Sequence, residues 1–185
     1  MPYGSENFLV GARKGIVARL LGTTSAVVYG TSYQLDVLNM ATVTAEPITD
    51  RLEGDDARKA LYAAQVGGTI ELDFAFKSFQ ALAAIFGSTV IDSGTYEQLP
   101  VDNTVMPYFA MNVEVVDQDG RVSADMWVPC CKIMGNIPFP VQYGKYWRMK
   151  IQAQFILCTD PRYPYFFDII NHSAITPPTI PPTYT

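Results

Sequence analysis

The residue types that most often carry out catalysis are scarce in this sequence. It contains a single histidine, His172. A Ser-His-Asp or Cys-His system needs its histidine held against an oriented carboxylate and beside a nucleophile. The residues next to His172 give no sign of such a system, so we interpret it as a surface or interface residue. The chain is therefore predicted not to be an enzyme.

The chain also contains three cysteines: Cys130, Cys131 and Cys158. Their odd number and their spacing do not fit a metal site, and they are typical of reduced thiols in a β-rich core. A redox switch between Cys130 and Cys131 is disfavoured, because adjacent residues of a strand point to opposite faces. With one histidine and no paired cysteine motif, we expect neither zinc nor any other cofactor.

Carboxylates cluster in residues 46–60. Glu53, Asp55 and Asp56 lie close enough in sequence to chelate a hard cation. The Asp-x-Asp-x-Asp-Gly loop of a calcium site is absent, however. Counter-charges lie in the same stretch, at Arg51, Arg58 and Lys59. A solvated loop or a loop that contacts another subunit is the favoured interpretation.

The composition restricts the possible partners. The chain has 185 residues, 49% hydrophobic and 17% charged, with a net charge of -5 and a pI of about 4.7. Its length fits one β-domain with extended arms, and its weakly charged surface suits self-association. Without clustered Lys and Arg, free DNA and anionic lipid are poor partners. No apolar stretch reaches a membrane span and no secretory signal is visible, so we expect a protein kept in a cytosol.

Alternation of apolar and polar residues predicts a mainly antiparallel β fold. One β-hairpin is predicted, because two runs of alternating apolar and polar residues flank the turn Asp117-Gln118-Asp119-Gly120. Gly67-Gly68 is interpreted as a turn or the start of a strand. Each strand should have one apolar face and one wet or interfacial face. The expected strands are residues 15–21, 33–45, 69–76, 109–116, 122–128 and 146–155.

One short helix is predicted over residues 78–86. It would be capped by Ser78 and would end at Gly87. The spacing of its apolar residues predicts one buried face. That face would consist of Phe79, Leu82, Ala83 and Phe86.

The chain is expected to be one β-domain with an arm at each end. Residues 1–12 form the N-terminal arm, residues 13–160 the β-domain, and residues 161–185 a Pro-rich C-terminal arm. From Thr176 onward, four prolines favour extended, polyproline-like chain.

The order and spacing of these features resemble the major tail tube proteins of long-tailed phages. A long strand is followed by Glu46-Pro47-Ile48-Thr49-Asp50 and Leu52-Glu53-Gly54-Asp55-Asp56. A second strand and a short helix ending in Ile85-Phe86-Gly87 come next. The strand before Thr159-Asp160-Pro161 completes a likeness that covers about residues 15–160.

The resemblance implies an antiparallel β-sandwich or partial barrel with one flanking helix, closing into a hexameric β-barrel ring. Stacked rings would form the channel for genome ejection, with the charged loop (46–60) touching the next ring. The implied partners are further copies of the chain, the tape measure, tail terminator and distal tail proteins, and passing DNA without sequence readout; no membrane is implied. The implied location is the virion tail, assembled in the host cytoplasm.

Within this scheme, the polar face of the long strands would line the channel, and an acidic wall would repel phosphate. The candidate lumen residues are Thr42, Thr44, Glu46, Glu71 and Asp73. The candidate inter-ring residues are Asp50, Arg51, Glu53, Asp55, Asp56, Arg58 and Lys59. Arg148 and Lys150 fit an acidic wall less well, because cations on a polar strand face favour an outward or inter-subunit position.

Two other functions fit the same pattern. A β-sandwich module could bind carbohydrate or a receptor by stacking sugars on aromatic rings, although core packing explains alternating aromatics more simply. The aromatic candidates are Tyr96, Tyr108, Trp127, Tyr143, Tyr146 and Trp147. The third possibility is a secretion-type or bacteriocin tube subunit, which would share the tube fold.

Overall fold

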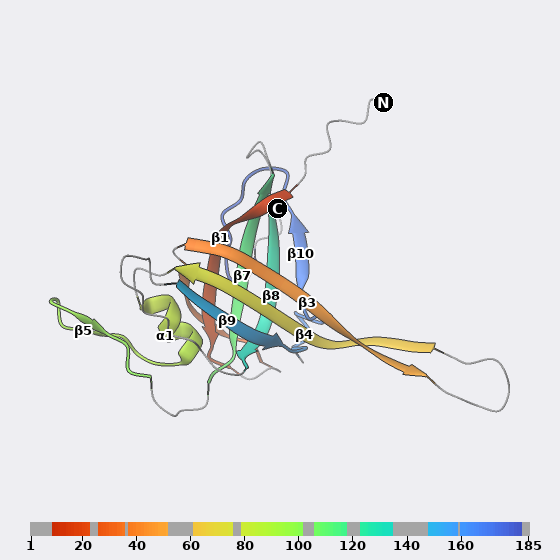
Figure 1. The fold of residues 1–185 in the computed structure, drawn as a ribbon, viewed down its shortest axis with the longest axis horizontal. Helices are drawn as coiled ribbons and strands as arrows, with labels where there is room; N and C mark the ends of the chain where they lie inside the picture. The colour runs from red at the N-terminus through yellow and green to blue at the C-terminus, as the bar shows by residue number, and fades with distance from the viewer. Residues whose placement is uncertain are drawn as a thin grey trace.

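The computed structural model describes residues 9–22, 26–35, 37–51, 61–75, 79–101, 106–117, 123–134, 148–158 and 160–182. This part of the chain is mainly β, with antiparallel strand pairs and one helix (Figure 1), as predicted. The elements are β1 (Leu9–Leu20), β2 (Tyr29–Leu35), β3 (Val37–Arg51), β4 (Leu61–Ala75), α1 (Gln80–Phe86), β5 (Ile91–Asp92), β6 (Glu97–Gln98), β7 (Phe109–Asp117), β8 (Ser123–Ile133), β9 (Arg148–Phe155) and β10 (Asp168–Asn171).

The main sheet is open. Its strand order is β2-β1-β7-β8-β9-β4-β3, with β10 paired to β8 as a branch and β5-β6 forming a separate hairpin. In Figure 1, β3, β4 and β9 cross in front of β1, β7 and β8. The sheet therefore folds over itself into two layers, and β2 and β3 are its two edges in the described part.

The first core lies between the two layers and takes residues from both layers and from α1. On β9, Met149, Ile151 and Phe155 are buried, whereas Arg148 and Lys150 are exposed. The predicted alternation of this strand is confirmed.

Helix α1 closes one side of the first core, next to β1 and β2. The predicted stop at Gly87 is confirmed: its φ is 75°, and its N–H donates to the Ala83 carbonyl at 2.8 Å. The N-cap is Phe79, without a side-chain hydrogen bond, and Ser78 lies outside the described residues. All residues from Ala81 to Phe86 are buried, so the helix is enclosed on more than the one predicted face.

The long strands differ from the prediction. Residues 33–45 are divided between β2 and β3, and β3 continues to Arg51. Glu46, Asp50 and Arg51 thus belong to a strand and not to a loop, because the β-favouring Ile48 and Thr49 extend the pairing.

A two-stranded ribbon results, defined here as residues 46–51 paired with residues 61–67. Strand β9 accompanies β4 only as far as Gly68, which pairs with Phe155. Beyond that point the ribbon extends away from the two layers (Figure 1). Gly67 and Gly68 lie inside β4 and not at a turn or strand start.

The second face of β7 and β8 is buried within the chain, contrary to the prediction of a wet or interfacial face. A second core covers it: Leu20, Val27, Ala110, Trp127, Cys130, Cys158, Tyr163 and Ile170. Tyr163 and Ile170 come from the expected C-terminal arm, and β10 pairs with β8. That segment is therefore part of the packed body, and His172, predicted to be a surface or interface residue, is 4% exposed. At the other end, β1 begins at Leu9, so residues 9–12 belong to a strand and not to an arm.

Strand β8 changes partner along its length. It pairs with β10 from Ala124 to Trp127 and with β9 from Cys131 to Ile133. Pro129 lies between the two pairings, opposite an irregularity in the register of β7. Proline has no N–H to donate, so this position suits a break in the ladder.

Candidate functional site

The candidate site is the exposed face of β3, β4 and β9, called here the outer face. Pairing across the three strands places nine residues in three rows: Thr44-Thr69-Gln154, Thr42-Glu71-Gln152 and Met40-Asp73-Lys150. Thr42, Thr44 and Glu71 are exposed. The structure thus brings these three predicted lumen residues together on one face, with Thr42 directly opposite Glu71.

Asp73 belongs to the outer face but is only 5% exposed. The Arg148 guanidinium covers it, with Nη2 donating to Oδ2 at 2.7 Å and Nε donating to Oδ1 at 3.3 Å. A carboxylate held by a two-pronged ion pair presents little free charge to solvent. Of the predicted lumen residues, Glu46 lies in β3 opposite Gly67, and its side chain is outside the described residues.

The outer face is electrically mixed, not acidic as predicted. Asp73 and Glu71 lie on β4, and the cations Arg148 and Lys150 lie on β9. Lys150 pairs across the strands with Asp73, and the two acids and two cations cancel formally. A shallow hollow of about 300 Å³ lies among these rows, lined by Met40, Glu71, Asp73, Lys150 and Gln152 together with Leu72 and Ile151.

Two of the seven predicted inter-ring residues lie at the far end of the ribbon. Asp50 pairs with Tyr62 and Arg51 with Leu61. Glu53, Asp55, Asp56, Arg58 and Lys59 lie outside the described residues.

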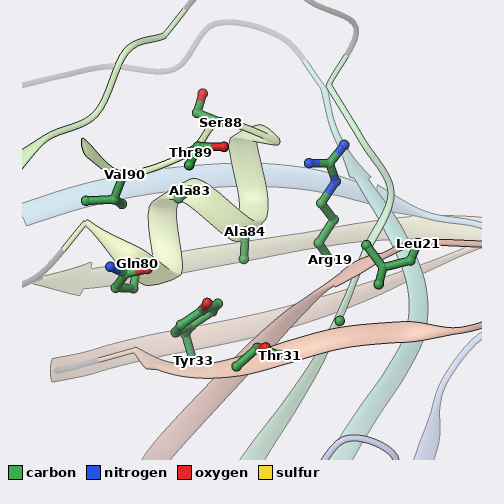
Figure 2. A pocket seen from close by; sticks show the side chains of 11 residues that line it. Arg19, Leu21, Thr31, Tyr33, Gln80, Ala83, Ala84, Ser88, Thr89 and Val90 are labelled. Carbon is green, nitrogen blue, oxygen red and sulfur yellow. The ribbon is translucent and has the colours of Figure 1, made fainter. Parts of the chain in front are cut away.

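A second hollow of about 340 Å³ lies between α1 and the edge strand β2 (Figure 2). Among the described residues that line it, Arg19 is the only charged one, and its Nη1 already donates to the Gly87 carbonyl at 3.1 Å. Thr31, Tyr33, Gln80, Ser88 and Thr89 supply the other polar side chains of this lining. The described lining therefore contains no acid-base pair. The sequence gives no sign of this hollow, because its two walls are about fifty residues apart in the chain and neither carries a motif.

One arrangement in the second core has the residue types of a hydrolytic triad. His172 Nε2 lies 3.4 Å from Asp125 Oδ2, and the His172 N–H donates to the Ser123 carbonyl at 2.9 Å. The Ser123 hydroxyl, however, bonds to the backbone: Oγ donates to the Ala174 carbonyl at 3.4 Å and accepts the Thr176 N–H at 3.0 Å. All three side chains are buried. A nucleophile engaged in this way and closed to substrate does not fit catalysis.

Other titratable groups in the second core have pKa values shifted by their surroundings. Burial raises the pKa of the Tyr29 hydroxyl, and burial also raises the pKa of the Cys131 thiol in the first core. A hydrogen bond from Cys130 lowers the pKa of Cys158. These groups are enclosed in packed cores and do not border either hollow, so we assign them to packing.

The aromatic residues of the carbohydrate-binding alternative are dispersed. Trp127 is fully buried, and Tyr108 is half-buried beneath the ammonium of Lys132, 5.2 Å from its ring centroid. Tyr96, on the β5-β6 hairpin, is 59% exposed. The remaining three candidates, Tyr143, Tyr146 and Trp147, lie outside the described residues.

Within the described ranges, no group of three or more His, Cys, Asp or Glu side chains is arranged to hold a metal ion. The single helix that the structure describes is too short to cross a membrane. No protein-family model matches the sequence, and no curated protein matches it. The likeness to tail tube proteins therefore rests on the order of the sequence features alone.

Proposed function

We propose that this chain is the subunit of a phage tail tube, polymerising as stacked hexameric rings around the channel for genome ejection. The main support for this proposal is the two-stranded ribbon. It pairs with no third strand of the described chain, and a two-stranded ribbon alone is marginally stable in water. A neighbouring subunit would supply the surface that the ribbon lacks.

The open edges of the sheet support self-assembly. Natural sheets protect their edges with charged residues or proline. Strand β2 has neither, and residues 37–45 of β3 have neither. Pairing of one edge with the opposite edge of the next copy is a heterologous contact, which closes into a ring when the rotation allows.

The outer face is suited to line a channel. Proteins that hold DNA do so with clustered Lys and Arg. Here Arg148 is engaged by Asp73, and Lys150 lies opposite Asp73 in the strand register, so phosphate would find no cluster of free cations. Threonine and glutamine supply the rest of the polar surface, which lets DNA pass without sequence readout. Tape measure, terminator and distal tail proteins would then contact the bore and ends of a tube kept in the virion tail after assembly in the host cytoplasm.

Negative-stain electron microscopy of the concentrated, purified chain tests the proposal. We expect hollow tubes or six-fold rings. Thr31→Lys and Ser32→Lys, both on exposed positions of β2, should abolish them by placing charge on the edge. Thr95→Lys, on the β5-β6 hairpin outside the main sheet, is the matched control and should leave tubes intact.

The proposal fails if the chain stays monomeric at every concentration and instead binds a glycan array. That result would favour the carbohydrate-binding module. Tubes seen only inside a contractile or secretion apparatus would favour the secretion-type or bacteriocin setting.

A further inference from the structure

The second face of β7 and β8 carries a buried group of polar residues, called here the acidic patch: Asn112, Glu114 and Asp125. Their exposures are 0%, 1% and 1%. Glu114 and Asp125 face each other directly across the two strands. Two carboxylates thus lie side by side where solvent does not reach.

Only some of the polar atoms of the acidic patch have hydrogen-bond partners among the described residues. Asn112 Nδ2 donates to Asp125 Oδ2 at 2.8 Å, and His172 Nε2 lies 3.4 Å from the same oxygen. Among the described residues, neither carboxylate oxygen of Glu114 has a hydrogen-bond partner, and Oδ1 of Asp125 has none. Lys14 of β1 pairs with Glu114 in the strand register, but the structure gives no ion pair between them.

Residues 168–182, called here the strap, cover this face. Strand β10 pairs with β8. Beyond β10, Ile180 packs against the second core, and hydrogen bonds join the strap backbone to β7 and β8. The carbonyl of Thr179 accepts Asn112 Nδ2 at 3.1 Å, and the Thr176 N–H reaches the Ser123 hydroxyl at 3.0 Å. Much of the strap faces outward: Ile169 is 60% and Ile175 is 37% exposed.

Burying an ionised carboxylate without partners is strongly unfavourable. Opening of the cover would let solvent reach Glu114 and Asp125. The closed strap therefore carries a cost that the open strap does not, and its apolar contacts and hydrogen bonds must offset that cost.

We propose that the strap is a displaceable cover and that the charge of the acidic patch favours its release. Opening would uncover the edge of β8 from Ala124 to Trp127, which β10 now occupies. This inference does not depend on the proposed function.

Hydrogen exchange of the full chain, followed by mass spectrometry, tests this proposal. Glu114→Gln keeps the shape of the side chain and removes its charge, and Asp125→Asn does the same for its neighbour. We expect exchange in residues 168–182 to slow by about tenfold or more, because an uncompensated buried group costs at least this factor in an equilibrium. Glu71→Gln, on the outer face, is the matched control and should leave strap exchange unchanged. Equal exchange in all four proteins would overturn the proposal.

A second measurement on the unmodified chain guards against variants that unfold. Between about pH 4 and pH 7, a range that covers the ordinary pKa values of Asp, Glu and His, strap exchange corrected for the intrinsic rate should increase with pH. Asp125 and Lys14 lie opposite Glu114 in the register of the two neighbouring strands, and His172 lies beside Asp125. A carboxylate that loses its proton becomes costlier to bury, so a rising pH should favour opening. The proposal would be contradicted if the corrected exchange rate of the strap did not change with pH. It would also be contradicted if that rate changed in parallel with the exchange rates of β4 and β9.

Discussion

The carboxylate of Asp160 accepts the backbone N–H of Val27 at 2.9 Å, although 133 positions separate the two residues. Arg162 completes the contact, with Nη2 donating to Asp160 Oδ2 at 2.6 Å and to the Val27 carbonyl at 2.7 Å. This clamp joins the turn between β1 and β2 to the segment after β9. It closes the end of the second core where Tyr29, Tyr163 and Trp127 pack edge to face.

Asp160→Asn should lower the melting temperature by several degrees at neutral pH. Hydrogen bonds from the Arg162 side chain, from the Arg162 N–H and from the Val27 N–H hold the pKa of the Asp160 carboxyl well below its usual range. Because the pKa of Asp160 is lowered in the folded state, its carboxylate contributes its full stabilisation above the ordinary Asp pKa of about 3.9. This contribution is lost as the pH falls below that pKa. Thermal unfolding of variant and unmodified chain should therefore converge in acid.

Asp92→Asn is the control for this prediction. Its carboxylate bonds to the Gly94 N–H within an exposed turn. It should change the melting temperature little at any pH. An Asp160→Asn difference that stayed constant into acid would contradict the ionic origin of the clamp.

Gly68→Ala should destabilise the chain strongly. A Cβ at Gly68 would overlap the Thr44 carbonyl oxygen and the ring of Phe155, where β3, β4 and β9 meet. Overpacking of this kind costs about 1–3 kcal/mol, and overlap with backbone places Gly68 at the upper end. The loss in the free energy of unfolding would be measured by urea denaturation.

Gly67→Ala provides the comparison one position away. Its Cβ would meet only the Phe155 carbonyl oxygen, at 3.1 Å. The expected cost is below about 1 kcal/mol. Similar losses at both glycines would show that the strands are not packed as closely as described.

Glu71→Cys tests whether the outer face lines a bore. In tubes, this thiol should react with a small maleimide that diffuses along the channel but not with a bulky PEG-maleimide. The native cysteines give little background because all three are buried. Thr95→Cys, on the β5-β6 hairpin, should react with both reagents, and so should Glu71→Cys before assembly. Full PEG modification of Glu71→Cys in intact tubes would place the outer face on the outside.

Reversal of charge at Asp55 and Asp56, as Asp55→Lys with Asp56→Lys, should reduce tube yield without altering folding. In the sequence, both positions lie between the two strands of the ribbon. Surface substitutions change stability by about 0.5 kcal/mol or less, so thermal unfolding should be unchanged. Unchanged tube yield, counted by electron microscopy, would remove this segment from the contact between rings.

Local signals predicted the parts of the fold that depend on neighbours in sequence. Glycine adopts the left-handed conformation that ends a helix, which fixed the end of α1 at Gly87. Alternation identified the buried side of β9 and placed Thr42, Thr44 and Glu71 on one face. These features follow from backbone geometry within a few residues.

Contacts between segments that are distant in the sequence could not be predicted from these local signals. Asn112 and Glu114 alternate with apolar residues as they would on a wet face, and nothing in β7 signals that the strap covers them. The surface interpretation of His172 failed for the same reason. Asp73 was assigned to an open polar face, but the register that brings Arg148 within 2.7 Å of it cannot be deduced from either strand alone.

The late position of the strap in the chain also imposes an order on folding. The first core draws its residues mainly from 17–155, so it can form as soon as β9 has left the ribosome. The second core must wait for Tyr163 and Ile170, which are synthesised later. During that interval Trp127 and Ala110 would be open to water or to another nascent chain. A chaperone that bound this transient surface would act when the subunit has folded around its first core and still exposes the apolar residues of its second.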